Sequence, residues 1–471
     1  MAPRSLSHCP NEVQLACIKL LALPNLAAVS MVSQSLRRLS FPLLYAHIQM
    51  EWSPGHHPRL MLLLRSLLES PQLCSHVLSL KLDGQSSITE SGTPKELPRI
   101  VALPGMELSQ AITRTGVPQD VADSWTSKTQ EGVPDAVVAL VVSMLPNLAS
   151  LSLQTNWSVE SHYLGHVLRS VLCTSGPDTI QHELPTFQAL RNVSVEQRSP
   201  LDERPDYKNS ADMLALFYLP NIQTLSVSID NPVRFAWPSE QPPVPSKLTS
   251  LRLERLRECY LEPVLSALTN LQTLRYDWFH RGDIDREISD NVVRLGLMAS
   301  PMAKHKTLRN LEITGLTMPE FRHGSWDDLS FALQGSLTAL SQVPQLESLT
   351  IPWVFIGGLD LQFSPGRIGS ALPPSLEYLA LSPDMVDDGR REWIDEDIIS
   401  AIKAELESGA MAHLRNLKTI SFQKFIFTDQ AIQTNEAEIQ RLNARFGLEV
   451  MLPRSRNVKR VNHPSFAVMI D

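Results

Sequence analysis

The side chains that could do chemistry are scattered along this sequence and form few recognisable sets. The sequence has no GxSxG elbow and no HExxH helix, and no cysteine lies in a nucleophile motif. We therefore expect no enzymatic activity; an active site assembled from distant residues is the alternative. The cysteines contain no CxxC pair, which predicts neither a zinc cluster nor a disulfide framework. They are Cys9, Cys17, Cys74, Cys173 and Cys259.

Three other groups could bind an ion or a phosphate. His56 and His57 are adjacent in a proline-bounded turn without a nearby Cys or Asp, which favours exposed loop residues over metal ligands. The glycines at 357–358 and 366–369 match neither a P-loop nor GxGxxG, so no phosphate cradle is predicted. An acidic stretch lacks the EF-hand order of ligands and favours a solvated loop before a helix. Its members are Asp384, Asp387, Asp388, Glu392, Asp395, Glu396 and Asp397. We predict no metal and no cofactor.

Composition narrows the class of protein. The chain has 471 residues, 43% of them hydrophobic, which predicts a large core and more than one domain. Its formal net charge of -8 gives no basic field for nucleic acid or anionic lipid. The most apolar stretches, such as Leu60 to Leu68, are shorter than the roughly 20 residues that span a bilayer. Neither nucleic acid nor membrane is an expected partner. Without a recognisable signal peptide, the chain is expected in cytoplasm or nucleus.

A short pattern recurs along most of the chain. It consists of an apolar residue, two variable residues, a second apolar residue, one variable residue and a third apolar residue. Helix-like segments lie between the copies, which is typical of an α/β solenoid with one parallel sheet. The ten copies begin at Val77, Leu148, Leu190, Ile222, Leu248, Leu271, Leu308, Leu346, Leu376 and Leu417.

This pattern resembles the leucine-rich repeat family over roughly Val77 to Leu452. The Asn that the family has after the third apolar residue is present as Asn156 but replaced in other copies, and the spacing of copies varies. The resemblance therefore implies an irregular leucine-rich-repeat solenoid, a parallel sheet lined by helices. Five segments are predicted: a helical module at 1–50, a connecting helix and first strand at 51–84, a mobile polar insertion at 85–133, the solenoid at 134–452 and a flexible basic tail at 453–471.

The first fifty residues predict three short helices, Pro10 to Leu21, Pro24 to Met31 and Ser33 to Ile48. Proline is tolerated in a first helical turn, so Pro10 and Pro24 mark helix starts. A segment of this length forms only a small core, so we expect it to pack against something else.

The same segment resembles the F-box family. The run from Cys9 to Leu15 matches that family's opening helix, except that Cys9 replaces the usual Leu. The resemblance implies docking on a Skp-type adaptor and, through it, on a cullin. The residues expected to dock are Pro10, Glu12, Val13, Leu15, Ile18, Leu23, Pro24 and Leu26. The alternative is that the module only caps the first repeat.

The two resemblances together predict a substrate-recognition adaptor of a Skp/cullin/F-box E3 ubiquitin ligase, whose repeats bind a protein target. Trp278 and Trp353 are the candidate target-binding residues, because large aromatic side chains anchor many interfaces. The alternative for each is packing inside the solenoid. The alternative for the chain is a leucine-rich interaction scaffold without a role in ubiquitin transfer. The fold does not specify the target.

Overall fold

The computed structural model describes most of the chain, in two compact units. Unit 1 comprises Met1–Leu274 and Asp283–Asp290, and unit 2 comprises Arg275–Gly282 and Asn291–Asp471. The described residues are 9–52, 59–84, 99–173 except 102, 104, 106, 155, 159 and 160, 184–196, 211–281 except 230, 231 and 233, 290–318, 321–322, 325–326, 331–359, 363–385, 393, 395–423 and 429–452. His56, His57 and the basic tail lie outside them.

Twelve strands form one sheet, in the hydrogen-bonded order β1-β2-β3-β4-β5-β6-β7-β9-β13-β14-β15-β16. The chain is an α/β protein with a repeat-like parallel sheet lined by helices, which confirms the predicted fold class. Unit 1 contains β1 (His47–Glu51), β2 (Ser79–Asp83), β3 (Ser150–Leu153), β4 (Asn192–Val195), β5 (Thr224–Ser228) and β6 (Ser250–Glu254), which pair in parallel.

The recurring apolar pattern sets the register of these strands. Leu80, Leu151, Val193, Leu225 and Leu251 lie directly opposite one another on β2 to β6, and all are buried. Because side chains alternate along a strand, the neighbours of these residues on the same strand point to the other face of the sheet. The middle apolar residues of successive copies therefore form one continuous row in the core.

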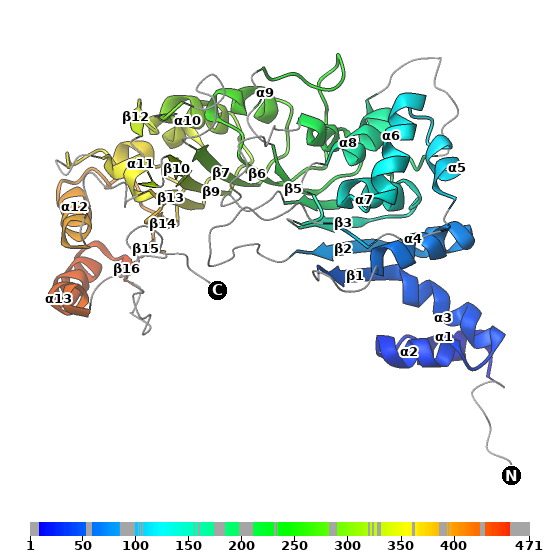
Figure 1. The fold of residues 1–471 in the computed structure, drawn as a ribbon. Coiled ribbons are helices and arrows are strands. Elements are labelled where there is room, and N and C mark those ends of the chain that lie inside the picture. Colours follow the sequence, from blue (N-terminus) through cyan, green and yellow to red (C-terminus); the bar gives the residue numbers. More distant parts are fainter. Residues whose placement is uncertain are drawn as a thin grey trace, which may run out of the picture. The chain divides into compact units, whose positions relative to one another are not determined.

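Helices cover one face of the unit 1 strands, where α4 (Arg59–Glu69), α7 (Pro134–Ser143) and α8 (His162–Leu172) are visible in Figure 1. Every residue of α7 is buried, because α4, α6 and α8 pack around it. The shorter helices of this unit are η2 (Pro71–His76), η3 (Ala211–Tyr218), η4 (Glu258–Tyr260) and α9 (Leu261–Leu265).

Two helices lie where the sequence predicted a mobile polar insertion. They are α5 (Leu108–Thr113) and α6 (Gln119–Gln130); residues 85–98 are outside the described part. Trp125 is fully buried, and its indole N–H donates to the Ala136 oxygen at 2.8 Å. Ala122, Trp125 and Thr129 form one buried stripe on an otherwise polar helix. This stripe is short, which is why composition alone indicated a loop.

Asparagine side chains connect neighbouring repeats. In unit 1, three side-chain amides just before a strand each donate to a backbone oxygen of the preceding repeat, at 2.8 Å in all cases; they belong to Asn147, Asn221 and Asn270. In unit 2, Asn416 donates to Pro374 at 3.1 Å. The amide donates a hydrogen bond to a carbonyl in the turn, which has no hydrogen-bond partner in the sheet. This asparagine is not the one the family pattern led us to expect; it stands one residue before the first apolar residue of the copy.

Unit 2 continues the pattern. Its strands are β7 (Thr273–Arg281), which contains the unit boundary, β9 (Asn310–Met318), β13 (Ser348–Pro352), β14 (Tyr378–Ser382), β15 (Thr419–Phe422) and β16 (Glu449–Met451). Its helices are α10 (Leu295–Ala303), α11 (Trp353–Gly357), η5 (Thr338–Gln342), η6 (Gly369–Ala371), α12 (Asp395–Glu407) and α13 (Asp429–Phe446).

Two of the unit 2 segments between copies, which were expected to be helix-like, begin as strands. They contribute β8 (Val292–Arg294) and β12 (Ala332–Gln334), which pair in parallel, and the helices α10 and η5 follow. A short hairpin of β10 (Phe321–Arg322) and β11 (Ser325–Trp326) lies between them in the chain. β-branched valines at 292 and 293 favour a strand over a helix.

The N-terminal helices are α1 (Asn11–Ile18), α2 (Leu23–Ser30) and α3 (Gln34–Ala46), as predicted. The Ser33 hydroxyl caps α3 by accepting from the Leu36 N–H at 3.2 Å. Ile18, Leu26 and Leu36 form a small core, against which parts of Val29, Leu39, Leu43 and Leu44 pack. The third helix ends two residues earlier than predicted, because His47 and Ile48 already belong to β1.

Candidate functional site

Exposed apolar side chains gather on the N-terminal helices. Leu20, Met31 and Val32 have 88%, 80% and 71% of their surface exposed. Elsewhere in the described residues, large exposed apolar side chains are far apart along the sequence, as at Leu297 and Val244. A gathered set of this kind marks an interaction site in soluble proteins. We call the set the apolar surface; it consists of Val13, Leu20, Leu21, Leu23, Met31 and Val32.

The ends of α2 position most of this surface. Leu20 and Leu21 lie in the turn between α1 and α2, and Met31 and Val32 lie in the turn before α3. The eight residues of α2 span about 12 Å at 1.5 Å per residue. In the second half of α2 the exposed side chains are the small ones of Ala27 and Ala28. Two apolar clusters thus flank a stretch that a partner's backbone can approach closely.

The orientation of α1 turns Val13 toward solvent. The residues that α1 buries are Gln14 and Ile18, one helical turn apart. The Gln14 amide N–H donates to the Cys9 oxygen at 2.7 Å, while its side-chain oxygen is buried with no hydrogen-bond partner among the described residues. A polar residue therefore occupies the inner face of α1, and Val13 is 46% exposed.

The eight residues expected to dock separate into two sets. Leu15 is half-buried, whereas Ile18 and Leu26 are only 1% and 4% exposed because they form the module's own core. Those two cannot contact a partner directly, which corrects the expectation. The exposed members are Pro10, Glu12, Val13, Leu23 and Pro24. Leu20, Met31 and Val32 were not among the residues expected to dock; the available signal was that they lie at or next to the predicted helix ends, Leu21 and Met31.

The two candidate target-binding tryptophans are in the interior. Trp278 and Trp353 are 1% and 0% exposed. The Trp353 ring lies edge-on to Trp393, with centroids 5.1 Å apart. Alternation already indicated this placement, since Trp278 is two residues after the core residue Tyr276. Neither side chain can anchor a target on the surface of this structure, so the expectation is corrected in favour of interior packing.

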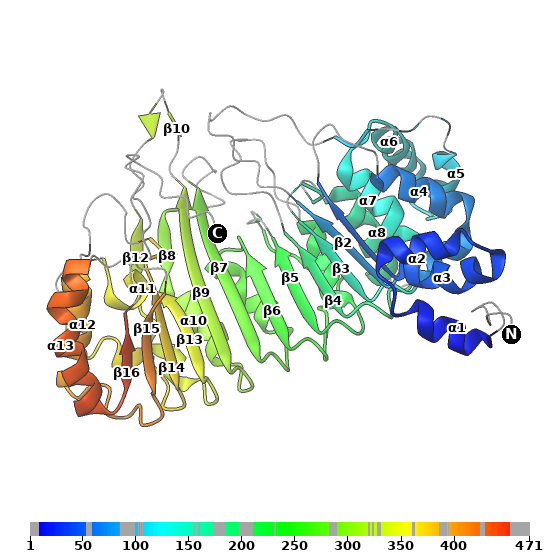
Figure 2. The same ribbon diagram turned by 90° about the horizontal axis from the view of Figure 1, so that it is seen from below.

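Figure 2 shows β2 to β6 side by side in the sheet, and the face of these strands opposite the core carries mostly small polar side chains. Ion pairs flank it, Lys81 with Asp83 at 3.0 Å and Arg252 with Glu254 at 2.7 Å. This face can offer hydrogen bonds but no aromatic anchor from the described residues of β2 to β6. Its central residues are opposite one another across the strands: Ser150, Asn192, Thr224 and Ser250 in one row, and Ser152, Ser194 and Ser226 in the next.

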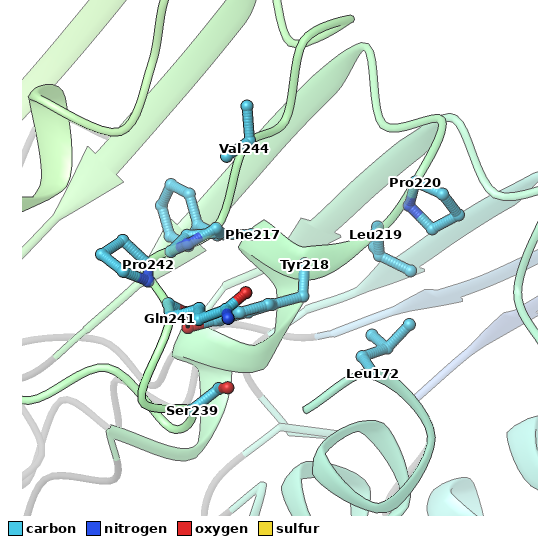
Figure 3. A pocket seen from close by; sticks show the side chains of 10 residues that line it. Leu172, Phe217, Tyr218, Leu219, Pro220, Ser239, Gln241, Pro242 and Val244 are labelled. Atoms are coloured by element: carbon cyan, nitrogen blue, oxygen red, sulfur yellow. Dashed lines mark hydrogen bonds between the residues drawn. The ribbon is translucent and has the colours of Figure 1, made fainter. Parts of the chain in front are cut away.

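A pocket of about 170 Å³ lies beside η3 (Figure 3). Leu172, Phe217 and Pro242 contribute apolar walls, and the Tyr218 hydroxyl donates to the Gln241 oxygen at 2.7 Å. Burial, and secondarily Cys173, raises the pKa of Tyr218. The described residues that line the pocket include no carboxylate, histidine or cysteine. It offers packing for a small group and no acid–base pair.

The glycines at 366 and 369 bind an anion that the chain itself supplies. Their N–H groups donate to the two carboxylate oxygens of Glu405, at 2.7 and 2.6 Å. Glu405 is fully buried. In the described part of the acidic stretch, Asp395 begins α12, as expected of a loop leading to a helix.

Within the described residues, no cluster of three or more His, Cys, Asp or Glu side chains could hold a metal ion. The described cysteines are all free thiols, and burial raises the pKa of Cys173 to about 11. None of the helices described is both long and apolar enough to cross a membrane.

No protein-family model matches the sequence, and no curated protein matches it either. Among solved structures, the crystal structure of the Rad7 and Elc1 complex in yeast is similar to this chain with a TM-score of 0.33 and 12% sequence identity. The match covers 92% of this chain and 96% of the other. A likeness at this level assigns neither a family nor a function to the chain.

Proposed function

We propose that the chain is a substrate-recognition adaptor of a Skp/cullin/F-box type E3 ubiquitin ligase. The N-terminal helices dock on a Skp-type adaptor, and the repeats hold a protein target. The apolar surface carries this proposal, because Leu20, Met31 and Val32 are exposed on a module whose own core is already filled. Uncovered apolar side chains on short helices are the kind of surface that a partner's helices bury.

The core of the module supports docking indirectly. Ile18, Leu26 and Leu36 pack together and hold the three helices in place. Docking therefore falls to Val13, Leu23 and the residues at the two turns, with Pro10, Glu12 and Pro24 beside them. The protein does no chemistry of its own in this proposal; it supplies proximity and orientation for a ubiquitin-loaded enzyme.

Binding to a purified Skp-type adaptor tests the proposal, with calorimetry on the full chain. The double variant Leu20→Ser with Met31→Ser should weaken binding about ten- to hundredfold, because each serine forfeits buried apolar area. Its unfolding midpoint should stay at that of the unaltered chain. The matched control is Leu297→Ser, an exposed leucine of unit 2, which should bind normally.

An unaltered chain that fails to bind any Skp-type adaptor would refute the docking proposal. Co-purification with the adaptor and a cullin, followed by ubiquitin transfer to a captured target, separates the ligase role from the leucine-rich scaffold alternative. A chain that binds the adaptor but never recruits a cullin would favour the scaffold.

A further inference from the structure

The strand β1 ends the sheet, with β2 as its neighbour on one side. An edge strand presents backbone N–H and C=O groups that can pair with another chain. The side chains of β1 that share the core face of the sheet are Ile48 and Met50, and both are only half-buried. Leu80 and Leu82, directly opposite them on β2, are fully buried. The core is therefore incompletely covered at this edge.

The hydrogen bonds of β1 show which of its backbone groups face outward. The Ala46 oxygen accepts from the Leu78 N–H at 2.9 Å, and the Trp52 N–H donates to the Asp83 oxygen at 2.8 Å. Backbone groups alternate sides along a strand, so the even-numbered residues face β2. The N–H and C=O groups of His47, Gln49 and Glu51 therefore point away from the sheet.

The side chains of β1 are complementary to those of a second β1 that runs antiparallel to it. If a second copy pairs antiparallel about Gln49, His47 lies opposite Glu51 of the other copy, and Ile48 lies opposite Met50. A histidine thus meets a carboxylate, an apolar residue meets an apolar residue, and Gln49 meets its own counterpart. The His–Glu and Ile–Met pairs are of kinds that stabilise antiparallel strands.

The alternation of outward-facing and inward-facing backbone groups along β1 is compatible with the same register. In an antiparallel ladder, hydrogen-bonded residue pairs alternate with non-hydrogen-bonded pairs. Pairing about Gln49 makes the outward-facing residues His47, Gln49 and Glu51 the hydrogen-bonded ones, with two backbone bonds at each pair. Pairing about Ile48 or Met50 would keep the same alternation but would place His47 or Glu51 opposite Gln49, so the side-chain pairs select Gln49 as the centre.

From these observations we propose that β1 is a self-association edge, at which two copies of this chain pair antiparallel about Gln49. A twofold contact of this kind uses the same surface of both copies and closes after two. The interface is short, so the dimer is weak and concentration-dependent, with a dissociation constant in the micromolar range. The inference does not depend on the proposed ligase role, because it uses neither the apolar surface nor an adaptor.

Sedimentation of the full chain over a range of concentrations tests this inference. All variants carry Leu20→Ser and Met31→Ser, so that the apolar surface cannot cause association by itself. This background should dimerise. Adding Gln49→Pro removes an outward N–H without removing a bond to β2, and proline is tolerated on edge strands. It should raise the dissociation constant about tenfold or more, whereas Gln49→Ala, which keeps the N–H, should leave it unchanged.

A charge exchange tests the register. Glu51→Lys should weaken the dimer by placing a cation opposite His47, and adding His47→Glu should restore it. The restoration is expected only if these two residues are opposite each other. A background chain that stays monomeric at all concentrations overturns the inference and leaves the edge to a strand of another protein. A dimer that Gln49→Pro does not weaken overturns it too, by assigning association to a different surface.

Discussion

The N-terminal helices and the repeats contain similar apolar residues but cover them to different extents. In the module only Ile18, Leu26 and Leu36 are core residues, and Leu20 and Met31 face solvent. In the repeats of unit 1, by contrast, the helix α7 is buried over its whole length and the leucines of the strands are buried on every copy. The repeats bury their apolar side chains against one another, because each copy covers the next. The outer side of the module has no such neighbour among the residues that the structure describes.

The largest expected effect lies in the repeats, at Trp353. Replacing this fully buried side chain by Trp353→Ala should lower the free energy of unfolding by about 3–5 kcal/mol, through lost burial and a cavity. Urea denaturation measures it. Trp237→Ala, at a half-buried tryptophan of unit 1, should cost clearly less. Equal losses at the two sites would mean that burial does not distinguish these positions.

A change in the module's core should act more locally. Ile18→Ala should destabilise the three helices by about 2–4 kcal/mol. Because the module's core is small and separate, amide hydrogen exchange should accelerate in α1 to α3 and stay unchanged in β13 and β14. Val13→Ala, at an exposed position of the same helix, is the control and should change neither. Faster exchange throughout the sheet would show that module and repeats unfold together.

The bonds between repeats should have a smaller effect. Asn270→Ala removes the amide that donates to the Ser246 oxygen, and should lower the free energy of unfolding by about 1 kcal/mol. Asn25→Ala, at an exposed asparagine of α2, gives the comparison. If both substitutions proved neutral, the amide bonds would not contribute measurably to repeat stacking.

The smallest expected effect is on stability at acidic pH. Burial, followed by the charges of His162 and Arg169, lowers the pKa of His166 in α8. The unfolded chain then binds a proton that the folded chain resists, so stability is full above the ordinary histidine pKa of about 6.5 and declines as the pH falls below it. His166→Gln should reduce this decline in unfolding midpoints measured across that range. The control His413→Gln alters an exposed histidine of unit 2; an equal change there would contradict the assignment.

Much of the fold followed from the sequence. The copies at Leu148, Ile222 and Leu346 became buried strands because three apolar residues at this spacing face one side of a strand and the turn that precedes it. The strand β1 was missed, because His47 and Ile48 continue a helical pattern and only the pairing with β2 overrides it.

The candidate site was less predictable. Spacing placed Val13 and Ile18 together on one helix, but it could not indicate that α1 buries Gln14 and turns Val13 outward. That choice depends on how three short helices pack against each other. The exposure of Leu20 and Met31 likewise depends on where α1 and α2 end, and helix ends are the positions that patterns define least well.

The asparagine bonds between repeats bear on how much the segments that connect the strands can vary. Asn147 reaches back to Ser75 across a long excursion of the chain, while Asn270 reaches Ser246 across a short one, and both make the same contact at 2.8 Å. The position at which the chain re-enters the sheet is thus the same whether the segment before it is long or short. Segments between strands can therefore lengthen, shorten or change sequence without shifting the strands.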